Sequence, residues 1–517
     1  MMNQTPDLNQ LSPNQLKTMA AQLLGENKQL LGENKQLQEE KARYAFINEK
    51  LSHELATLKR HRFAKTSEVL NSTQRQLFEE LLSEDIVAIE NELAELAPTE
   101  SSAKPKQQPK RKPLPPELPR TIISHEPDNT NCTCGCQMQR IGEDISEKLD
   151  YTPGEFTVER HVRGKWVCRD CDTLTQAPVP AHVIDKGMAT SGLLAHTLIA
   201  KYCDHLPLYR QERIFARAGV AIPRSTLAEW VGKCGVQLQP LVDRLQELVL
   251  EQDIIHGDET PVSMLAPGQK KTHRAYVWAY ATCKDADLKA VIYDFSESRA
   301  GKHAREFLGD WKGKLVCDDY AGYKASFESG VTELGCMAHA RRKFFDLHES
   351  SGSETAKQAL EYITLLYEIE RETKGLAPDK RLAIRQDKAK PIIDEIQKWM
   401  IAQRQRARDG SALAKAFDYS LKRWAALTRY LSDGNAPIDN NWVENQIRPW
   451  ALGRSNWLFA GSLRSGKRAA AIMSLIQTAK MNGVEPYAYL KDVLNRLPSH
   501  KNNRLDELLP HNWLAHQ

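Results

Sequence analysis

The sequence contains no apolar run close to the ~18 residues that a membrane-spanning helix needs. Its N-terminal stretch, MMNQTPDLNQ, lacks the basic and apolar regions of a secretory signal peptide. A large excess of either charge is also missing, because 71 Lys and Arg residues stand against 67 Asp and Glu residues, for a net charge of +4. The first two absences argue against a membrane protein or a secreted one, and we expect a soluble cytoplasmic protein.

Cysteine is sparse, with ten residues in a chain of 517. In a reducing compartment, cysteines bind metals or pack in cores more often than they form disulfides. Five of them form two groups around the β-like stretch FTVERHVRGKWV, an arrangement typical of a zinc ribbon. The second group is a regular CxxC knuckle, whereas the first is an irregular CxCxC. We expect Zn²⁺ to bind some of these five, which are Cys132, Cys134 and Cys136 in the first group and Cys168 and Cys171 in the second.

The remaining cysteines are isolated in the sequence and are expected to be packing residues. They are Cys203, Cys234, Cys283, Cys317 and Cys336.

A tandem repeat of LLGENKQ at residues 23–36 has the seven-residue period of a coiled coil. Leucine occupies one core position of this repeat (d) and asparagine the other (a). This favours a parallel two-stranded coil, because buried asparagines pair in register. We expect a homodimer through this helix; the alternative is an amphipathic helix packed on its own chain. The leucine-type core positions are Leu16, Leu23, Leu30, Leu37, Tyr44, Leu51 and Leu58.

Two further segments carry features of DNA binding. Residues 99–120 are rich in proline and basic side chains, which predicts an extended linker that either contacts phosphates or is a solvated tether. The stretch LPLYRQERIFARAGVAIPRSTLAEWVGKCG has the layout of a helix-turn-helix, with one helix ending at Gly219 and the next starting near Ser225. Arg224 lies where a recognition helix would begin. The alternative is a structural helical hairpin.

From residue 253 onward the sequence predicts short strands. DIIHGD predicts a strand ending at Asp258; RAYVWAYAT and KAVIYDF predict two more, and RAGKHAREFLGDW a helix. KLVCDDYAGY predicts a fourth strand ending at Asp318 and Asp319, and TELGCMAH a fifth, followed by the basic helix ARRKFFDLH. This β-β-β-α-β-β order matches the ribonuclease H-like fold, in which strands one and four are neighbours. Asp258 and Asp318 should therefore face each other.

Residues 346–432 are helical and charged in pattern, which predicts an all-α insertion, and PIDNNWVENQIRPW follows it. Pro437 and Asp439 resemble a helix start, with Glu444 within the next two turns. Segments rich in Arg and Lys come directly after this carboxylate. A carboxylate in such a basic neighbourhood is expected where a divalent ion neutralises it on one side and a phosphate approaches on the other. The alternative is an exposed ion pair between Glu444 and Arg448, worth only about 0.2–0.5 kcal/mol.

Three carboxylates suit phosphoryl transfer on DNA. Two Mg²⁺ or Mn²⁺ ions about 3.5–4 Å apart can stabilise the attacking and leaving oxygens of an in-line displacement. Mg²⁺ prefers oxygen ligands and keeps several waters, so a few carboxylates suffice to hold it.

At these residues the sequence closely resembles the DDE transposases of the insertion sequence 66 family. The resemblance rests on HGDETPV, KLVCDDYAGY, GCMAHARRKFF and PIDNNWVENQIRPWALGRSNWLFAGS, and extends to KYCDHLPLYRQERIFARAGV and SLIQTAKMNGVEPYAYLKDVL. LKRHRFAKTSEVL looks like that family's leucine-rich segment, and the cysteine region like its zinc-binding domain. The resemblance thus covers nearly the whole chain.

The resemblance implies that Asp258, Asp318 and Glu444 form the catalytic triad. Asp319 falls at a position that the family leaves variable and could be auxiliary. The family's first cysteine knuckle usually reads CxxCG, and here Asn131 stands at its first position. Cys132 or Cys136 must then substitute beside Cys134, so the resemblance leaves the zinc ligands open.

Other side chains near these motifs have two interpretations each. His256 and His339 are more often satisfied strand residues than catalysts. The tryptophans Trp442, Trp450 and Trp457 are expected mostly in the core, although one could stack on a base. The residues expected to contact DNA, rather than to form a solvated basic surface, are Arg224, Arg341, Arg342, Lys343, Arg448, Arg454 and Lys467.

These segments give a multidomain α/β protein. We expect a ribonuclease H-like catalytic core with an all-α insertion, preceded by a helical coiled coil, a zinc ribbon and a helix-turn-helix-like domain. The expected boundaries are 12–98 for the coiled coil, 99–120 for the linker, 121–180 for the ribbon, 188–250 for the helix-turn-helix-like domain, 251–345 and 433–470 for the two parts of the core, 346–432 for the insertion and 471–517 for a C-terminal helical segment.

The expected function is a transposase that binds the terminal inverted repeats of its element, cuts the DNA and joins it to a target. The resemblance implies that accessory proteins of the same element could be partners, and the protein would be associated with the bacterial nucleoid. Two alternatives are a non-catalytic DNA-binding repressor and a structure-specific nuclease that cuts without joining.

Overall fold

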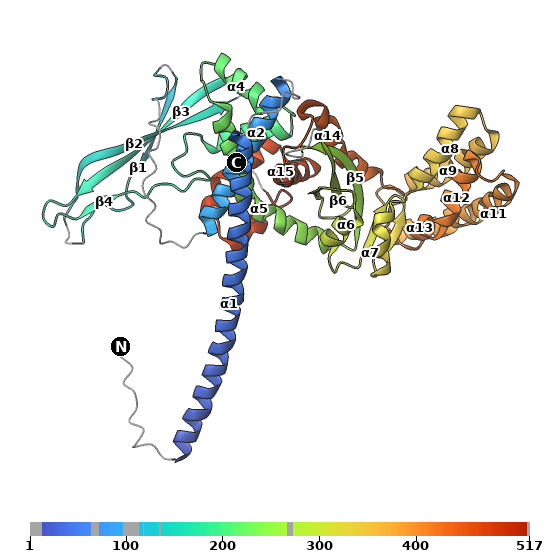
Figure 1. Cartoon of the computed structure of the whole chain (residues 1–517), viewed down its shortest axis with the longest axis horizontal. Coiled ribbons are helices and arrows are strands. Elements are labelled where there is room, and N and C mark those ends of the chain that lie inside the picture. Colours follow the sequence, from blue (N-terminus) through green and yellow to red (C-terminus); the bar gives the residue numbers. More distant parts are fainter. Residues whose placement is uncertain are drawn as a thin grey trace. The chain divides into compact units, whose positions relative to one another are not determined.

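The computed structural model describes the polypeptide over residues 13–63, 72–96, 113–116, 118–133, 136–152, 154–265 and 272–513. No helix within these ranges is long and apolar enough to cross a membrane. The chain divides into two compact units, and Figure 1 colours their helices and strands along the sequence. The first comprises Met1–Lys65 with Ile89–Gln108, and the second comprises Thr66–Ala88 with Pro109–Gln517.

The first unit contains the long helix α1 (Pro13–Phe63) and the C-terminal part of α2 (Ser72–Leu96). The helix expected from the heptad repeat is therefore present. Leu51 and Leu58 on its leucine face are buried, whereas Leu30, Leu37 and Tyr44 on the same face are between 52 and 61% exposed. The side chains of Leu16 and Leu23 lie outside the described part. The part of α1 from Leu30 to Tyr44 thus presents apolar side chains to solvent in the single chain.

The cysteine-containing region of the second unit is a twisted antiparallel hairpin with two short strands added. Its strands are β1 (Arg120–His125), β2 (Gln139–Thr152), β3 (Glu155–Val167) and β4 (Leu174–Gln176). The order is β1-β3-β2, with β4 also pairing with β3. β2 and β3 pair along almost their whole length, so the ends of this hairpin that precede β2 and follow β3 are brought together.

Three helices follow, namely α3 (Ser191–Tyr202), α4 (Leu208–Arg217) and α5 (Arg224–Leu250). α4 ends just before Gly219, whose φ of +87° lies in the region that glycine adopts most readily. α5 starts at Arg224 after Pro223, and the backbone N–H of Arg224 donates to Glu212 Oε1 (3.0 Å). The expected pair of helices with a short turn is therefore present.

The central sheet consists of β5 (Ile254–Met264), β6 (His273–Thr282), β7 (Val291–Ser296), β8 (Lys314–Cys317) and β9 (Thr332–Gly335). Its order is β7-β6-β5-β8-β9, so the first and fourth strands are neighbours, as expected. β5 and β8 are parallel, whereas β5, β6 and β7 form an antiparallel meander.

Two details of the strand prediction were wrong. β5 does not end at Asp258 but continues to Met264, because β6 pairs with it over that whole length. The fifth strand stops at Gly335, and the following CMAH belongs to a helix that begins at Met337. His339 is therefore a helical residue and not a strand residue. Short apolar runs of this kind do not distinguish strand from helix by pattern alone.

Helix α15 (Leu463–Met481) covers the edge of the sheet formed by β7. The backbone N–H groups of Val291 and Tyr293 on β7 donate to Thr478 Oγ1 (3.1 Å) and Ser474 Oγ (2.8 Å). These hydroxyls replace a neighbouring strand and prevent exposed pairing at the edge. The other helices of the core are α6 (Gly301–Leu308), η2 (Ala321–Tyr323), α7 (Lys324–Glu328), α8 (Met337–Ser351), α14 (Asn441–Trp457), α16 (Pro486–Arg496), η5 (Leu497–Ser499) and η6 (Asn502–Leu508).

The segment between α8 and α14 is helical, as expected of the insertion. It comprises α9 (Glu354–Glu372), α10 (Pro378–Ile384), the π-helical turn η3 (Arg385–Ala389), α11 (Lys390–Arg406), α12 (Ala412–Lys422), α13 (Trp424–Thr428) and η4 (Arg429–Ser432). These helices share a hydrophobic core with α8, centred on buried residues such as Phe344, Ile363 and Phe417.

One buried arginine organises the end of this helical segment. Arg385 is 1% exposed, and its guanidinium donates to both carboxylate oxygens of Glu370 (2.8 and 2.6 Å). It also donates to the backbone carbonyls of Tyr430, Asp433 and Ala436, at 2.8–3.0 Å. These carbonyls belong to the chain that leads into α14, so Arg385 fixes where α14 begins.

Replacing Arg385 by Ala should destabilise the second unit by about 3–5 kcal/mol, because Glu370 and three carbonyls would lose a buried charged partner. The measurement is chemical unfolding followed by tryptophan fluorescence. Arg371→Ala is the matched control, since Arg371 pairs with Glu368 on the surface with side-chain exposures of 67 and 52%. Its change should stay within about 0.5 kcal/mol. Equal destabilisation by the two substitutions would contradict this assignment.

Candidate active site and cysteine cluster

The register of the central sheet brings two of the expected carboxylates together. β5 and β8 pair in parallel, with Ile254 opposite Lys314 and His256 opposite Val316. Asp258 and Asp318 each lie two residues beyond this last pair, so both side chains project from adjacent chains on the same face. The carboxylate of Asp318 also accepts the backbone N–H of Tyr320 (3.0 Å), which holds the loop after β8 in place.

The third carboxylate reaches the same place through Asn440, the residue before α14. Asn440 is fully buried, and its side chain bonds to His256 Nδ1 (2.8 Å) and donates to the carbonyl of Gly257 (2.9 Å). Its backbone N–H donates to Cys336 Sγ (3.1 Å). Asn440 therefore ties the start of α14 to β5 immediately before Asp258. Glu444 lies one helical turn further on, in the first turn of α14.

The electrostatics of this site show that the carboxylates affect one another. Burial raises the pKa of Asp258 well above its ordinary value, and the charges of Glu259, Asp318 and Glu444 raise it further. Burial and the charge of Asp318 also raise the pKa of Glu259. A group of partly buried carboxylates of this kind is costly unless cations are present.

Two basic side chains, an imidazole and a guanidinium, lie beside Glu444, and both come from α8. His339 Nδ1 is 3.7 Å from Glu444 Oε1, and Arg342 Nη2 is 3.6 Å from Glu444 Oε2. Burial lowers the pKa of His339, although the charges of Glu444 and Asp318 act in the opposite direction. Within the described part of the chain, Glu444 Oε1 and His339 Nδ1 are buried atoms without a hydrogen-bond partner. Such orphaned ligand atoms beside carboxylates fit a divalent cation.

The remaining expected site residues lie around this centre in different ways. Asp319 is exposed and pairs with Arg423 Nε (3.5 Å). The guanidinium of Arg423 also donates to the backbone carbonyl of Asp318. Arg341 and Lys343 lie over the rings of Phe345 and Tyr419, so of the three basic residues on α8 only Arg342 contacts Glu444.

Arg448, Arg454 and Lys467 are exposed, and Arg454 donates to the carbonyl of Pro261 on β5 (3.1 Å). Trp450 is almost fully buried, while Trp442 and Trp457 are half-buried and pack against the same core.

Two features of the site were not foreseen from the sequence. The first is Asn440, whose contacts with β5 join residues 184 positions apart. The second is the pair of Glu259 and Arg299, with Arg299 Nε donating to Glu259 Oε1 (2.8 Å) and the guanidinium 4.2 Å from the ring of Tyr320. The only sequence signal for either was proximity to a motif, namely HGDET for Glu259 and IDNN for Asn440.

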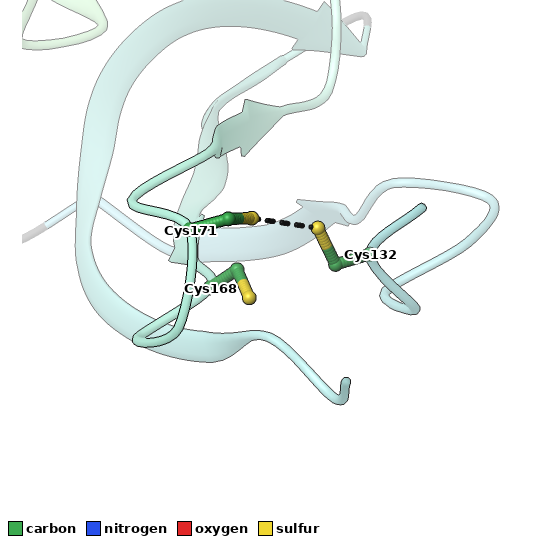
Figure 2. Close-up of side chains that lie close together, drawn as sticks. All are labelled: Cys132, Cys168 and Cys171. Atoms are coloured by element: carbon green, nitrogen blue, oxygen red, sulfur yellow. Dashed lines mark hydrogen bonds between the residues drawn. The ribbon is translucent and has the colours of Figure 1, made fainter. Parts of the chain in front are cut away.

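The cysteine region places three sulfur atoms together. The ligand atoms of Cys132, Cys168 and Cys171 lie within 4.8 Å of one another, and Cys132 Sγ is 3.0 Å from Cys171 Sγ. Figure 2 shows the three side chains converging from two separate loops. Cys136 forms a second such group with Cys168 and Asp170. Cys134, the remaining candidate, lies outside the described residues.

Local backbone bonds explain why these loops converge. The N–H of Cys132 donates to the carbonyl of Cys136 (2.8 Å), and the N–H of Cys168 donates to the carbonyl of Thr173 (3.0 Å). A backbone bond thus closes each of the two segments, and the β2–β3 hairpin holds them side by side. A cluster of thiol ligands on two turns fits tetrahedral Zn²⁺.

Asn440 provides a direct test of how the site is assembled. Asn440→Ala should lower the free energy of unfolding by about 2–4 kcal/mol, because the carbonyl of Gly257 and His256 Nδ1 would remain buried without their partner. Asn441→Ala is the control, since Asn441 is exposed and bonds only to Asp439 among the described residues. It should change stability by less than about 0.5 kcal/mol. The two variants are compared by chemical unfolding, and a neutral effect of Asn440→Ala would refute the bridging role.

The comparisons with known families cover almost the whole described chain. The model described as "Transposase IS66 family" matches residues 186–468, which is more than half of the sequence. The "IS66 C-terminal element" matches residues 474–511, and the "zinc-finger binding domain of transposase IS66" matches residues 129–172. A fourth model, "Transposase C of IS166 homeodomain", matches residues 50–123.

Long relatives occur in Sinorhizobium fredii. The uncharacterized protein y4hP is 36% identical over 492 residues, which cover 90% of this chain and 87% of that protein. The uncharacterized protein y4jD is 39% identical over 420 residues, which cover 78% and 82% of the two chains. The family models include the segments that carry Asp258, Asp318 and Glu444 as well as the cysteine region. The chain is therefore a member of the IS66 family of transposases.

Proposed function

We propose that this transposase binds the terminal inverted repeats of its own element and carries out DNA cleavage and strand transfer at one site built from Asp258, Asp318 and Glu444. The observation that supports the proposal is the convergence of chain segments: the parallel pairing of β5 with β8 brings Asp258 and Asp318 to one edge, and the bond from Asn440 to the carbonyl of Gly257 brings the first turn of α14, with Glu444, to the same place. In a DDE transposase, three such carboxylates are what the chemistry requires.

The core is, in this proposal, ribonuclease H-like. The support is the strand order β7-β6-β5-β8-β9, in which the first strand lies between the second and the fourth and is parallel to the fourth. A long helical segment separates β9 from the helix that carries the third carboxylate. The segment from α9 to η4 would then be an insertion into this core.

A divalent cation, Mg²⁺ or Mn²⁺, would supply Lewis-acid stabilisation of the phosphodiester and of the attacking oxygen. The three carboxylates would hold it, and Arg342 would offset part of their charge from the opposite side of Glu444. Asn440 would keep Glu444 at a fixed distance from β5. Cleavage by water and attack by the resulting 3′-hydroxyl are both in-line displacements at phosphorus, so the same residues serve both steps.

The DNA would be held by basic residues on several elements. The start of α5 with Arg224 would provide sequence recognition. The support is the short turn between α4 and α5, as between the two helices of a helix-turn-helix. Phosphate contacts would come from Arg341, Arg342, Lys343, Arg448, Arg454 and Lys467, and such contacts set affinity more than specificity. Double-stranded DNA of the element ends and of the target is thus the proposed partner.

Dimerisation would place two element ends together. The support is the apolar face of α1, where Leu30, Leu37 and Tyr44 are exposed in the single chain although they occupy the core positions of the heptad. A parallel coiled coil with a second copy would bury them. Accessory proteins of the same element and a nucleoid location belong to the same proposal.

Asp318 and its neighbour Asp319 offer a matched test of the catalytic assignment. Asp318→Asn should reduce Mg²⁺-dependent nicking of labelled DNA that carries the element ends by at least about 100-fold, because one of the three charged ligands is lost. Asp319→Asn should retain most of the activity, since Asp319 is exposed and pairs with Arg423. DNA binding, measured by gel shift, should be unchanged in both.

Each rival function gives a different pattern in this experiment. A repressor would bind the ends without metal-dependent nicking in any variant. A structure-specific nuclease would nick but give no strand-transfer products with target DNA. Full activity of Asp318→Asn would refute the catalytic triad itself.

The proposed zinc centre can be tested on the purified full-length chain. We propose Cys132, Cys168 and Cys171 as ligands, with Cys134 or Cys136 completing the set. Cys168→Ser should abolish stoichiometric zinc, measured by a colorimetric chelator after denaturation, because Cys168 is fully buried within the cluster. Cys203→Ser, at an isolated cysteine, should leave the zinc content unchanged. Equal zinc in both variants would rule out this ligand set.

A further inference from the structure

We propose that His339 is a further metal ligand in the active site, with its Nδ1 and Glu444 Oε1 binding the same divalent ion. The proposed metal position would then include a nitrogen ligand, and it would favour Mn²⁺ over Mg²⁺. The inference rests on the proposed function, because it concerns the same three carboxylates.

The geometry of the two atoms supports a shared ion. Their separation of 3.7 Å is too long for a hydrogen bond. Two ligands each about 2.1 Å from one ion can lie up to ~4.2 Å apart, so a single cation can contact both. Both atoms are buried, and within the described part of the chain neither has a hydrogen-bond partner. Buried polar atoms without partners are rare and indicate a missing ligand.

The other groups nearby are already engaged. Cys336 Sγ lies within 4.8 Å of both ligand atoms, but it accepts the N–H of Asn440. It is fully buried, which disfavours the thiolate that binds metals. The Nδ1 atom of His256 is bonded to Asn440. Arg342 approaches Oε2 of Glu444, which leaves Oε1 to face His339.

The position of His339 in the fold is fixed from two sides. It lies in the first turn of α8, shortly after β9. β9 pairs with β8, and Asp318 follows β8 directly. Asn440 links the residue before α8, Cys336, to the start of α14. The two helix starts that carry His339 and Glu444 are thus joined by one buried bond, and the pair is built into the fold.

The chemical consequence is metal preference. Mg²⁺ favours oxygen ligands in near-ideal octahedral geometry, whereas imidazole suits transition metals better. A site with carboxylates and one imidazole should therefore bind Mn²⁺ more tightly than Mg²⁺. Removal of the imidazole should weaken the binding of Mn²⁺ more than the binding of Mg²⁺.

The experiment uses the full-length protein and Mn²⁺ as the probe. Pulsed electron paramagnetic resonance of bound Mn²⁺ should show coupling to a ¹⁴N nucleus in the wild type, and the coupling should be absent in His339→Gln. His348→Gln is the matched control, because His348 lies further along α8 and bonds to the carbonyl of Ser353. Circular dichroism confirms that each variant is folded. Persistence of the ¹⁴N coupling in His339→Gln would overturn the inference.

Competition between the two ions gives a second readout. The ratio of Mg²⁺ to Mn²⁺ dissociation constants should fall by about tenfold or more in His339→Gln, since loss of even an outer-shell partner costs roughly 10–100-fold in metal affinity. An unchanged ratio would overturn the inference even if the variant were poorly active.

Asp258→Asn separates this inference from the function on which it rests. Suppose that Mn²⁺ binds the wild type without ¹⁴N coupling and that Asp258→Asn no longer binds it. The carboxylate site then stands, and only the role of His339 is wrong. If Mn²⁺ binds wild type and Asp258→Asn equally, both the carboxylate site and the role of His339 fail.

Discussion

The repulsion among partly buried carboxylates that lie close together is the constraint on which the central part of this molecule depends. Asp258 lies at a position where burial and three neighbouring acidic side chains all disfavour its charged form. A fold tolerates such a group only when the surrounding structure determines it strongly. Here the parallel pairing of β5 with β8 fixes two of the carboxylates, and the buried side chain of Asn440 fixes the approach of the third.

The helical segment between β9 and α14 contributes to the same arrangement. Its core includes residues of α8, so it anchors the helix that carries His339 and Arg342. Arg385 binds three backbone carbonyls of the chain just before α14, and Arg423 donates to the carbonyl of Asp318. The helical segment therefore also has a structural role at the site. Its buried arginines hold in place the loop after β8, which carries Asp318, and the chain before α14, which carries Glu444.

Much of the core could be predicted because strand patterns are local. Short apolar runs predicted the five strands along the chain. The match of their sequence order to the ribonuclease H-like fold then predicted that the first and fourth strands are neighbours, with Asp258 beside Asp318. The cysteine spacing likewise located the cluster, although it could not decide among Cys132, Cys134 and Cys136. The end of the fifth strand was wrong because CMAH is equally compatible with a helix, and this error placed His339 on the wrong kind of element.

The contacts that assemble the site could not be predicted, because each joins residues far apart in the chain. The bond between Asn440 and His256 spans 184 residues, and the bond between Arg299 and Glu259 spans 40. Nothing in a local pattern indicates which polar side chain will be buried opposite which backbone group. The leucine face of α1 is the converse case, since the heptad repeat is a local pattern that predicts a partner helix, and Leu30, Leu37 and Tyr44 on this face are exposed.

The most direct test of the account is the effect of Mg²⁺ on thermal stability in the wild type and in Glu444→Gln. A ligand at about 100 times its dissociation constant stabilises the folded state by about 2.7 kcal/mol. The wild type should gain a clear increase in Tm with saturating Mg²⁺, because the ion relieves the repulsion among the carboxylates. The variant should gain much less and should not be less stable than the wild type without metal. Equal increases in both proteins would contradict the claim that Glu444 completes a divalent-cation site.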